Sequence, residues 1–379
     1  MFIDYLFHHT GIYLFQSRLF STALATVFAF LLSMCLFQTY IKFLRKLQCS
    51  TEFSTEVGQL RTPVMPAGIL FLVVISIVTL LTVRFNTYVL SALIIYVFFS
   101  LIGAADDIAK VINKRRVAKG LITKQDYQYK ADGISASLRL TLYIAISLGV
   151  AIAAYELIPS ITGTITIPFV SVLKDYPYMP FWLFIPFMTI TIAVLANGVN
   201  FTDGFDTLST VPIMTSLTFL GVIAFVSSNI KWCAYLLIPH IPGIIETLPL
   251  LGAIAGTLLA FLWFNSPPAS IYMGDSGSVG LVGLIGIMFV FTKAGFFLPI
   301  VCFIFLMEFV SVVMQIGYFK LTKKRIFLMA PIHHHFQIRM RKSGKYGGEF
   351  QIKSIVAWRF HIISIVLLIV ALALFLKIR

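Results

Sequence analysis

Charged residues are scarce in this chain. Of its 379 residues only 12% are Asp, Glu, Lys or Arg, whereas 59% are hydrophobic and 36 are phenylalanine. A soluble domain has about a quarter of its residues charged. The chain therefore has too little polar surface to cover a water-soluble globule, and too much apolar mass to remain disordered.

Cysteine is also rare. The four cysteines lie far apart in the chain and form no CxxC or metal-ligand spacing: Cys35, Cys49, Cys233 and Cys302. This pattern excludes a disulfide scaffold and a zinc site built on cysteine. We interpret the four side chains as small packing residues.

Long apolar stretches are the main feature of the sequence. A helix needs about 20 residues to cross a hydrocarbon core of about 30 Å, and about ten stretches are long enough. They lie near residues 20–42, 66–83, 87–105, 137–157, 181–197, 211–227, 248–264, 278–292, 295–318 and 355–376. The sequence predicts an all-α integral membrane protein with about ten transmembrane helices in a single domain over residues 1–379.

Lys and Arg are distributed unequally between the connecting segments. With the N-terminus outside, 22 of the 29 fall on the inner side, and cytoplasmic loops carry such an excess. Both termini are therefore predicted to be periplasmic. The predicted cytoplasmic loops, which form the active-site face, are residues 43–65, 106–136, 198–210, 265–277 and 319–354. This distribution explains the net charge of +14 without nucleic acid. Basic residues follow the first span and do not precede it, which predicts a retained span rather than a cleaved signal peptide.

Five carboxylates stand at the ends of apolar spans, in three segments predicted to face the cytoplasm. They are Asp106, Asp107, Asp203, Asp206 and Asp275. Each alone could be a helix cap or part of an Asp-Gly turn. A carboxylate near hydrocarbon is costly and is usually functional, and five on one side of the membrane favour a site over five caps.

Oxygen ligands without cysteine favour a hard divalent cation. Mg²⁺ binds one or two carboxylates together with substrate phosphates, so the pattern predicts a phosphate-bearing substrate. The glycine-rich segment 274–280 can present backbone N–H groups to an anion, although it lacks the spacing of a P-loop.

A run of three histidines, His333, His334 and His335, follows a basic segment. Metal-binding histidines on one helix lie three to five residues apart, so the run does not predict a zinc site. The imidazoles are candidates for hydrogen bonds to a substrate phosphate, and the alternative is a solvated polar run at the membrane surface.

Together these segments resemble a known family. Residues 197–206 (NGVNFTDGFD), 261–265 (FLWFN), 272–278 (YMGDSGS) and 325–336 (RIFLMAPIHHHF) are similar to the signatures of the phospho-N-acetylmuramoyl-pentapeptide transferases. These belong to the polyprenyl-phosphate N-acetylhexosamine-1-phosphate transferase superfamily. The resemblance implies ten transmembrane helices, often a homodimer, in the bacterial cytoplasmic membrane. It also implies that UDP-N-acetylmuramoyl-pentapeptide and undecaprenyl phosphate react, with Mg²⁺, to give lipid I and UMP for peptidoglycan synthesis.

The resemblance implies roles by matching position. Asp106 and Asp107 match the paired aspartates of the family, and Asp275 matches its magnesium-binding aspartate. The other positions that match the substrate cleft of the family are Lys110, Asn200, Asp203, Asp206, Asn265, His333, His334 and His335. Three more are implied to lie near the uracil: Gly204, Phe205 and Tyr272.

Two segments depart from the family pattern. Residues 59–68 lack the usual lysine, which Arg61 could replace, and residues 120–126 leave open whether Lys124 or Lys130 supplies a cation.

Two alternative functions are considered. A UDP-N-acetylglucosamine transferase would share the aspartates but carry a different histidine loop. A transporter would place its carboxylates near the bilayer midplane, whereas these carboxylates cluster at the cytoplasmic ends of spans.

Overall fold

The structure is a computed structural model that describes residues 5, 8–9, 11–47, 49, 63–118, 133–158, 165–168 and 178–376. In this part of the chain, helices form the framework, and an isolated bridge pairs Val64 with Ile271. The longer helices are α2 (Arg18–Lys46), α3 (Gly68–Thr82), α4 (Thr87–Ala118), α6 (Ala136–Leu157), α7 (Phe181–Thr202), α8 (Thr210–Ser227), α10 (Leu248–Asn265), α11 (Asp275–Phe291), α13 (Phe303–Thr322), α14 (Ile332–Lys342) and α15 (Glu349–Leu376). Short turns of helix connect them: η1 (Tyr13–Gln16), α9 (Ile230–Leu236), η3 (Ile244–Thr247), η4 (Gly295–Phe297) and α12 (Leu298–Val301).

Eight of the described helices are long and apolar enough to cross a membrane. The apolar helices α3 and α11 are shorter, with 15 and 17 residues, and coincide with two further predicted spans. The predicted all-α, multi-span membrane fold is confirmed. The ninth predicted span, 295–318, differs from the expectation because the chain turns through η4 and α12 before α13 begins at Phe303.

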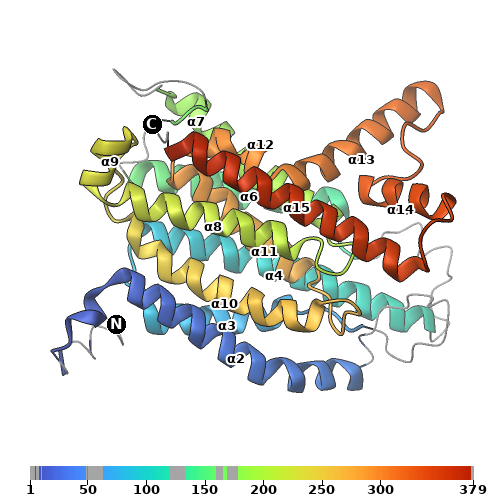
Figure 1. Cartoon of the computed structure of the whole chain (residues 1–379), viewed down its shortest axis with the longest axis horizontal. Helices are drawn as coiled ribbons and strands as arrows, with labels where there is room; N and C mark the ends of the chain where they lie inside the picture. Colours follow the sequence, from blue (N-terminus) through green and yellow to red (C-terminus); the bar gives the residue numbers. More distant parts are fainter. Residues whose placement is uncertain are drawn as a thin grey trace.

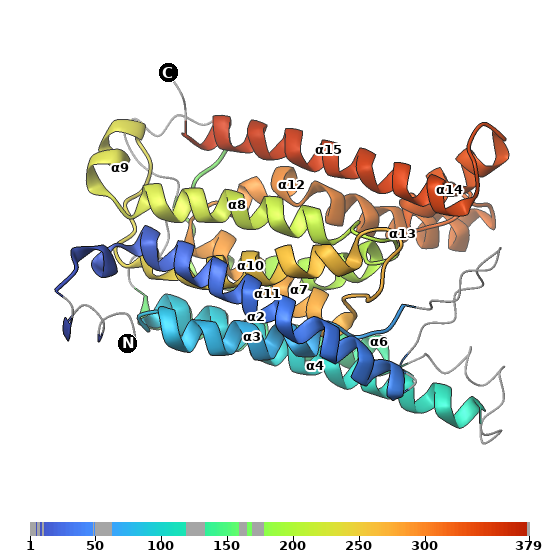
Figure 2. The ribbon, with the colours of Figure 1, turned by 60° about the horizontal axis from the view of Figure 1, so that its bottom comes forward.

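Helix α11 is the centre of the bundle. It packs against α3, α4, α7 and α8, and every residue from Ser276 to Phe291 is buried (Figures 1 and 2). A helix that is apolar on all sides is stable only when other helices surround it. Its surroundings also explain its glycines, because a Cβ at Gly280 or Gly283 would overlap the side chains of α4.

Helices α4 and α11 approach each other closely where the C-terminal part of α4 meets the N-terminus of α11. A Cβ at Gly103 of α4 would overlap the backbone of Asp275, the first residue of α11. The C-terminal part of α4, which carries Asp106 and Asp107, therefore lies beside the N-terminus of α11. Small residues at helix contacts allow such short distances between backbones.

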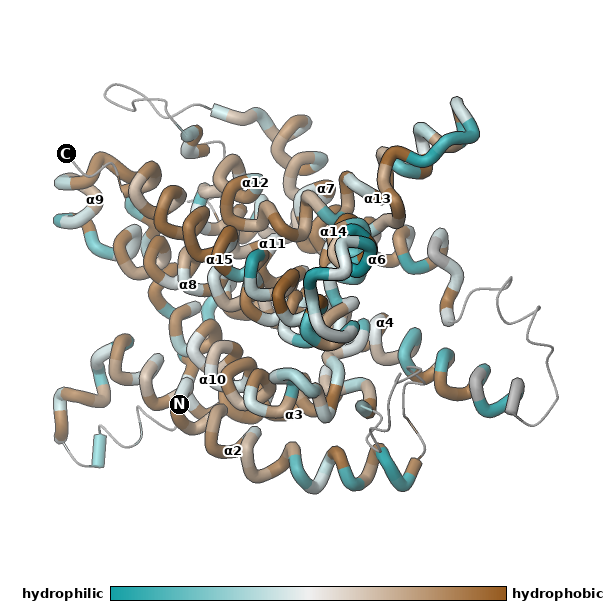
Figure 3. Tube along the Cα trace, turned by 45° about the vertical axis from the view of Figure 1, so that its right-hand side comes forward, coloured by the Kyte–Doolittle hydropathy of each residue, from teal (hydrophilic) through white to brown (hydrophobic). Residues whose placement is uncertain are grey.

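Hydrophilic residues gather at one end of the bundle. They lie on α14, at the tip of α13 and on the last turns of α2 and α4 (Figure 3). The beginning of α2 and the end of α15 lie at the opposite end (Figure 1). The carboxylates predicted from the sequence thus share the polar end.

The contact between α2 and α10 depends on small residues, which gives a test of the packing. A Cβ at Gly256 would overlap the carbonyl oxygen of Thr26, so Gly256→Ala should force the helices apart. Overpacking of this kind costs about 1–3 kcal/mol. We expect a lower Tm in detergent, measured by intrinsic fluorescence.

The matched control is Gly149→Ala in α6. A Cβ at the exposed Gly149 has no heavy atom within 4 Å, and alanine is the better helix former by about 1 kcal/mol. This variant should keep or raise the Tm. Equal losses for both variants would contradict the assigned α2–α10 contact.

Candidate active site

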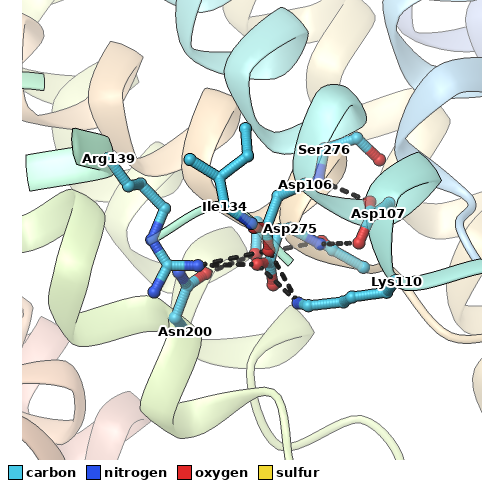
Figure 4. A network of polar contacts seen from close by, with 10 residues as sticks. Asp106, Asp107, Lys110, Ile134, Arg139, Asn200, Asp275 and Ser276 are labelled. Atoms are coloured by element: carbon cyan, nitrogen blue, oxygen red, sulfur yellow. Dashed lines mark hydrogen bonds and ion pairs between the residues drawn. The ribbon is translucent and has the colours of Figure 1, made fainter. Parts of the chain in front are cut away.

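Two carboxylates and two cations from three helices meet at the polar end of α11. Lys110 Nζ lies 2.8 Å from Asp106 Oδ2 and 2.9 Å from Asp275 Oδ2. Arg139 of α6 contacts the same two oxygens at 3.2 and 3.1 Å (Figure 4). Both cations therefore bridge the aspartate of α4 and that of α11. We call Asp106, Asp107, Lys110, Arg139 and Asp275 the aspartate cluster.

Asp107 performs a different task from its neighbour. Its Oδ1 accepts a hydrogen bond from the backbone N–H of Asp275 at 3.1 Å, and its Oδ2 accepts one from Ser276 at 2.9 Å. The first N–H groups of a helix have no partner within it, and the helix dipole favours an anion there. The fully buried Asp107 thus caps α11 and positions Asp275.

Asp106 is held on its other side by the chain before α6. Its Oδ1 accepts a hydrogen bond from the backbone N–H of Ile134 at 2.7 Å. A Cβ at Gly133 would overlap this carboxylate, so the backbone approaches closely there. The Asp275 side chain is 17% exposed and that of Asp106 only 1%, so Asp275, Lys110 and Arg139 form the accessible part of the cluster.

The donor chemistry of the cluster fits Mg²⁺. Three carboxylates face two cations, which leaves one formal negative charge, and the ligand atoms are oxygens. Among the described residues, no group of three or more His, Cys, Asp or Glu side chains could hold a metal ion alone. A site with one or two carboxylates that is completed by substrate phosphates is typical of Mg²⁺.

Asn200 and Asp203 extend the cluster along the end of α7. Ser278 donates a hydrogen bond to Asn200 Oδ1 at 3.2 Å, and Asn200 Nδ2 is buried without a partner among the described residues. Asp203 accepts a hydrogen bond from Ser209 Oγ at 2.7 Å. Burial raises the pKa of Asp203 to about 7, and the nearby Asp107 charge adds to the increase. The hydrogen bond from Ser209 opposes it.

Asp206, Asn265 and Tyr272 join two connecting segments. Asp206 accepts hydrogen bonds from Tyr272 OH at 2.9 Å and from Ala269 N at 3.1 Å. The buried Asn265 accepts one from Thr207 N and donates one to the Ile271 carbonyl, both at 2.9 Å. Burial, followed by the charge of Asp206, raises the pKa of Tyr272. These contacts fix the loop around residues 203–209 against the segment that leads into α11.

The segment that departs from the family pattern supports the same region. Val64 pairs with the segment near Ile271, and the backbone N–H groups of Ala67 and Gly68 donate hydrogen bonds to the Met273 carbonyl at 3.1 and 3.0 Å. The part of this segment that contains Pro66 and Ala67 is therefore ordered against the chain that leads into α11. Residues Arg61, Lys124 and Lys130 lie outside the described residues.

The three histidines occupy different environments at the start of α14. His333 is 1% exposed, and its ring lies 4.6 Å from that of Phe205, measured between centroids. His334 Nδ1 lies 2.8 Å from Gln337 Oε1, and His335 Nδ1 accepts a hydrogen bond from Leu328 N at 3.1 Å. Burial and the neighbouring His333 lower the pKa of His334. The histidines thus form a second group, joined to the aspartate cluster through the loop that contains Asp203, Gly204 and Phe205.

Sequence reasoning missed three residues of this region. Arg139 had no signal, because its position in α6 reveals nothing about the aspartates it bridges. Lys353 of α15 lies over the Phe205 ring at 5.6 Å, which only the tertiary fold brings about. Glu308 could have been found, since it is a carboxylate within a predicted span, and a carboxylate near hydrocarbon is usually functional.

Comparisons with known proteins find similar sequences over most of the chain. The model of the family described as glycosyl transferase family 4 matches residues 89–293, more than half of the chain. A relative from Bartonella quintana, named phospho-N-acetylmuramoyl-pentapeptide-transferase, is 41% identical over 288 residues, which cover 76% of this chain and 72% of the relative. Relatives of the same name from Campylobacter curvus and from a Nitratiruptor species are 37% and 35% identical. The first covers 86% of this chain and 84% of the relative, and the second covers 91% and 94%.

The raised pKa of Asp203 predicts a pH-dependent stability. A carboxyl with an ordinary pKa of 3.8 in the unfolded chain and about 7 in the folded protein stabilises the fold below pH 3.8. This contribution declines as the pH rises toward 7. Asp203→Asn removes this titration. The Tm of both proteins is followed by thermal unfolding from pH 5 to pH 8. As the pH rises, the Tm of Asp203→Asn should increase relative to the Tm of wild type.

Ser209→Ala is the matched control, because it removes the hydrogen bond to Asp203 but keeps the carboxyl. Its Tm should retain a pH dependence of the wild-type kind. A constant difference between Asp203→Asn and wild type across the range would show that Asp203 does not titrate there.

Proposed function

Because the chain belongs to glycosyl transferase family 4 and to the phospho-N-acetylmuramoyl-pentapeptide transferases within it, we propose that it transfers phospho-N-acetylmuramoyl-pentapeptide from the UDP-linked donor to undecaprenyl phosphate. The products are lipid I and UMP. The names of the relatives favour this donor over UDP-N-acetylglucosamine.

The aspartate cluster carries the proposal. Phosphoryl transfer requires little covalent chemistry from the protein and depends on positioning and electrostatic stabilisation. Lys110 and Arg139 form a pair of cations with exposed fractions of 27% and 20%, which suits two phosphorylated substrates. A transporter fits less well, because the carboxylates lie at one end of the bundle.

An apolar groove beside the cluster suits the lipid tail. It has a volume of about 370 Å³ and is formed by α6, α7 and α13, with residues such as Leu140, Ile144 and Phe309 in its lining. Leu140 follows Arg139 in the chain, so one end of the groove adjoins the cluster. A polyprenyl chain in this groove would place its phosphate near Arg139 and Lys110.

The nucleotide is proposed to bind at the loop of residues 203–206. Phe205 is buried there, and Lys353 and His334, which adjoin its ring, provide polar groups. In the reaction, an oxygen of the lipid phosphate attacks the β-phosphorus of the donor. The bond to the oxygen of the α-phosphate breaks, and UMP leaves with that oxygen.

Asp106 is proposed to orient the lipid phosphate through the two cations that it shares with Asp275. A phosphate monoester has its second pKa near about 6, so strong general-base catalysis is not required. Lys110 and Arg139 offset the charge of the phosphates as they approach each other. Asp275 would hold Mg²⁺, which supplies electrostatic stabilisation of the pyrophosphate when bound.

The setting of the reaction follows from the same proposal. The polar end of the bundle faces the cytoplasm of a bacterium, both termini face the periplasm, and residues 1–379 act as one domain in the cytoplasmic membrane. A homodimer is proposed from the family resemblance.

The direct test is release of UMP by the purified protein in detergent with undecaprenyl phosphate. We expect release with UDP-N-acetylmuramoyl-pentapeptide, loss of turnover in excess EDTA, and recovery with Mg²⁺ or Mn²⁺ without any requirement for Zn²⁺. The control donor is UDP-N-acetylglucosamine. Preferential use of the control donor would assign the chain to the sister activity, and full turnover in EDTA would refute the proposed metal dependence.

The two neighbouring aspartates should respond differently to substitution. Asp106→Asn removes a charge from the cluster, and we expect kcat to fall about 100-fold or more with little change in Tm. Asp107→Asn replaces two acceptors by one acceptor and a donor beneath α11. This should cost about 1.5–3 kcal/mol of stability as well as activity. Activity and Tm are measured on the same preparations. A stable Asp107→Asn protein with wild-type Tm would contradict the capping role of Asp107.

A further inference from the structure

Glu308 is a buried carboxylate that takes no part in the aspartate cluster. Glu308 is 0% exposed and stands in the first half of α13, where Ser311 is the only other polar residue. A buried carboxylate is costly unless it is paired or hydrogen-bonded. Its surroundings therefore indicate what it does.

Glu308 contacts the first turn of α14 at two points. Its Oε2 lies 3.1 Å from His333 Nδ1 and accepts a long hydrogen bond of 3.5 Å from the His333 backbone N–H. One turn further along α13, Ser311 Oγ accepts a hydrogen bond from the backbone N–H of Ile332 at 3.1 Å. The residue before α14, Pro331, provides no side-chain cap. Helix α13 therefore supplies the N-terminal cap that the sequence of α14 lacks.

The His333 ring is held between Glu308 and the loop of residues 203–206. On the side away from Glu308, a Cβ at Gly204 would lie 2.7 Å from His333 Nε2. The ring also packs edge-on against Phe205, at an interplanar angle of 70°. Neither ring nitrogen of His333 makes a hydrogen bond of good geometry among the described residues, although Nδ1 lies 3.1 Å from Glu308 Oε2. A ring with one nitrogen at a carboxylate and the other against a glycine has little freedom to rotate.

The same loop reaches the aspartate cluster. Asp203, next to Gly204, lies near enough to the backbone of Gly274 for this group to oppose the rise in its pKa, and Gly274 directly precedes Asp275. Contacts thus continue from Glu308 through His333 and the loop to the start of α11. The loop is the segment to which the proposed function assigns the nucleotide.

We propose that Glu308 is a positioning residue, which holds the His333 ring against Gly204 and so keeps the loop of residues 203–206 in the form that binds the nucleotide donor. This inference rests on the proposed function for its kinetic consequence. A carboxylate only accepts hydrogen bonds, so Glu308 favours the form of His333 with a proton on Nδ1. His333 is buried beneath the loop and acts through it, whereas the half-buried His334 is better placed to touch a substrate.

The test compares Glu308→Leu with Glu308→Gln. Leucine fills the space without an acceptor, whereas the glutamine oxygen can still accept from Nδ1. We expect Glu308→Leu to raise the KM for UDP-N-acetylmuramoyl-pentapeptide about tenfold or more, with a much smaller change in kcat and in the KM for undecaprenyl phosphate. Glu308→Gln should restore most of the donor KM. Gly204→Ala, which crowds the opposite side of the ring, should reproduce the defect of Glu308→Leu.

Glu246→Leu is the matched control. Glu246 pairs with Arg18 at 2.9 Å, and both residues lie near the ends of α2 and α10 that are remote from the cluster. This variant should lower the Tm and leave both KM values unchanged. A purely structural role for Glu308 predicts the same pattern for Glu308→Leu, with a lower Tm and an unchanged donor KM, and would overturn the proposal.

A spectroscopic measurement separates this inference from the proposed function. The ring nitrogens of His333 are observed by NMR of protein labelled with ¹⁵N-histidine, with His333→Gln to assign the signals. We expect an Nδ1-protonated ring in wild type and a changed protonation pattern in Glu308→Leu. Identical His333 signals in the two proteins would refute the pairing. If wild type releases no UMP from either donor, the proposed function fails, and the NMR comparison by itself decides whether Glu308 holds His333.

Discussion

The hydrogen bonds from the N-terminus of α11 to the Asp107 carboxylate are the contact on which the rest of the site depends. They place a buried anion where the helix has unpaired N–H groups and a positive dipole end. They also fix the backbone of Asp275 beside α4, so that Asp106 and Asp275 can share Lys110 and Arg139. Glycines make this possible, because Gly274 has a φ of 74° and lies too close to Pro66 and Asp107 to carry a side chain.

The proposed function requires the site to receive anions, and its cations are already balanced by carboxylates. Lys110 and Arg139 are each shared between two carboxylates, so they remain in place before any phosphate arrives. A phosphate that approaches them meets cations that need little reorganisation, which is the condition for electrostatic catalysis. The three carboxylates and two cations leave one net negative charge, which would favour the binding of a divalent cation.

Two helices in this protein begin with caps that come from other parts of the chain. Asp107 of α4 caps α11, and Glu308 with Ser311 of α13 caps α14. In each case a buried acceptor fixes the start of a helix that carries proposed site residues. The loop of residues 203–206 lies between the two capped ends. It connects the apolar interior to the polar surface, where a lipid substrate and a water-soluble substrate would meet.

The sequence by itself determined the membrane class, the apolar helices and the aspartates at their ends, because hydrocarbon allows only long apolar helices and makes each carboxylate near it conspicuous. The family signatures were also readable in the sequence, since they are local. Only the tertiary structure decided that Asp106 faces the cations while Asp107 caps α11, and that Asn265 and Asp206 join loops. It also brought Arg139 and Glu308 into place. These roles depend on which backbone groups and charges approach from distant segments, and no local pattern of residues encodes that approach.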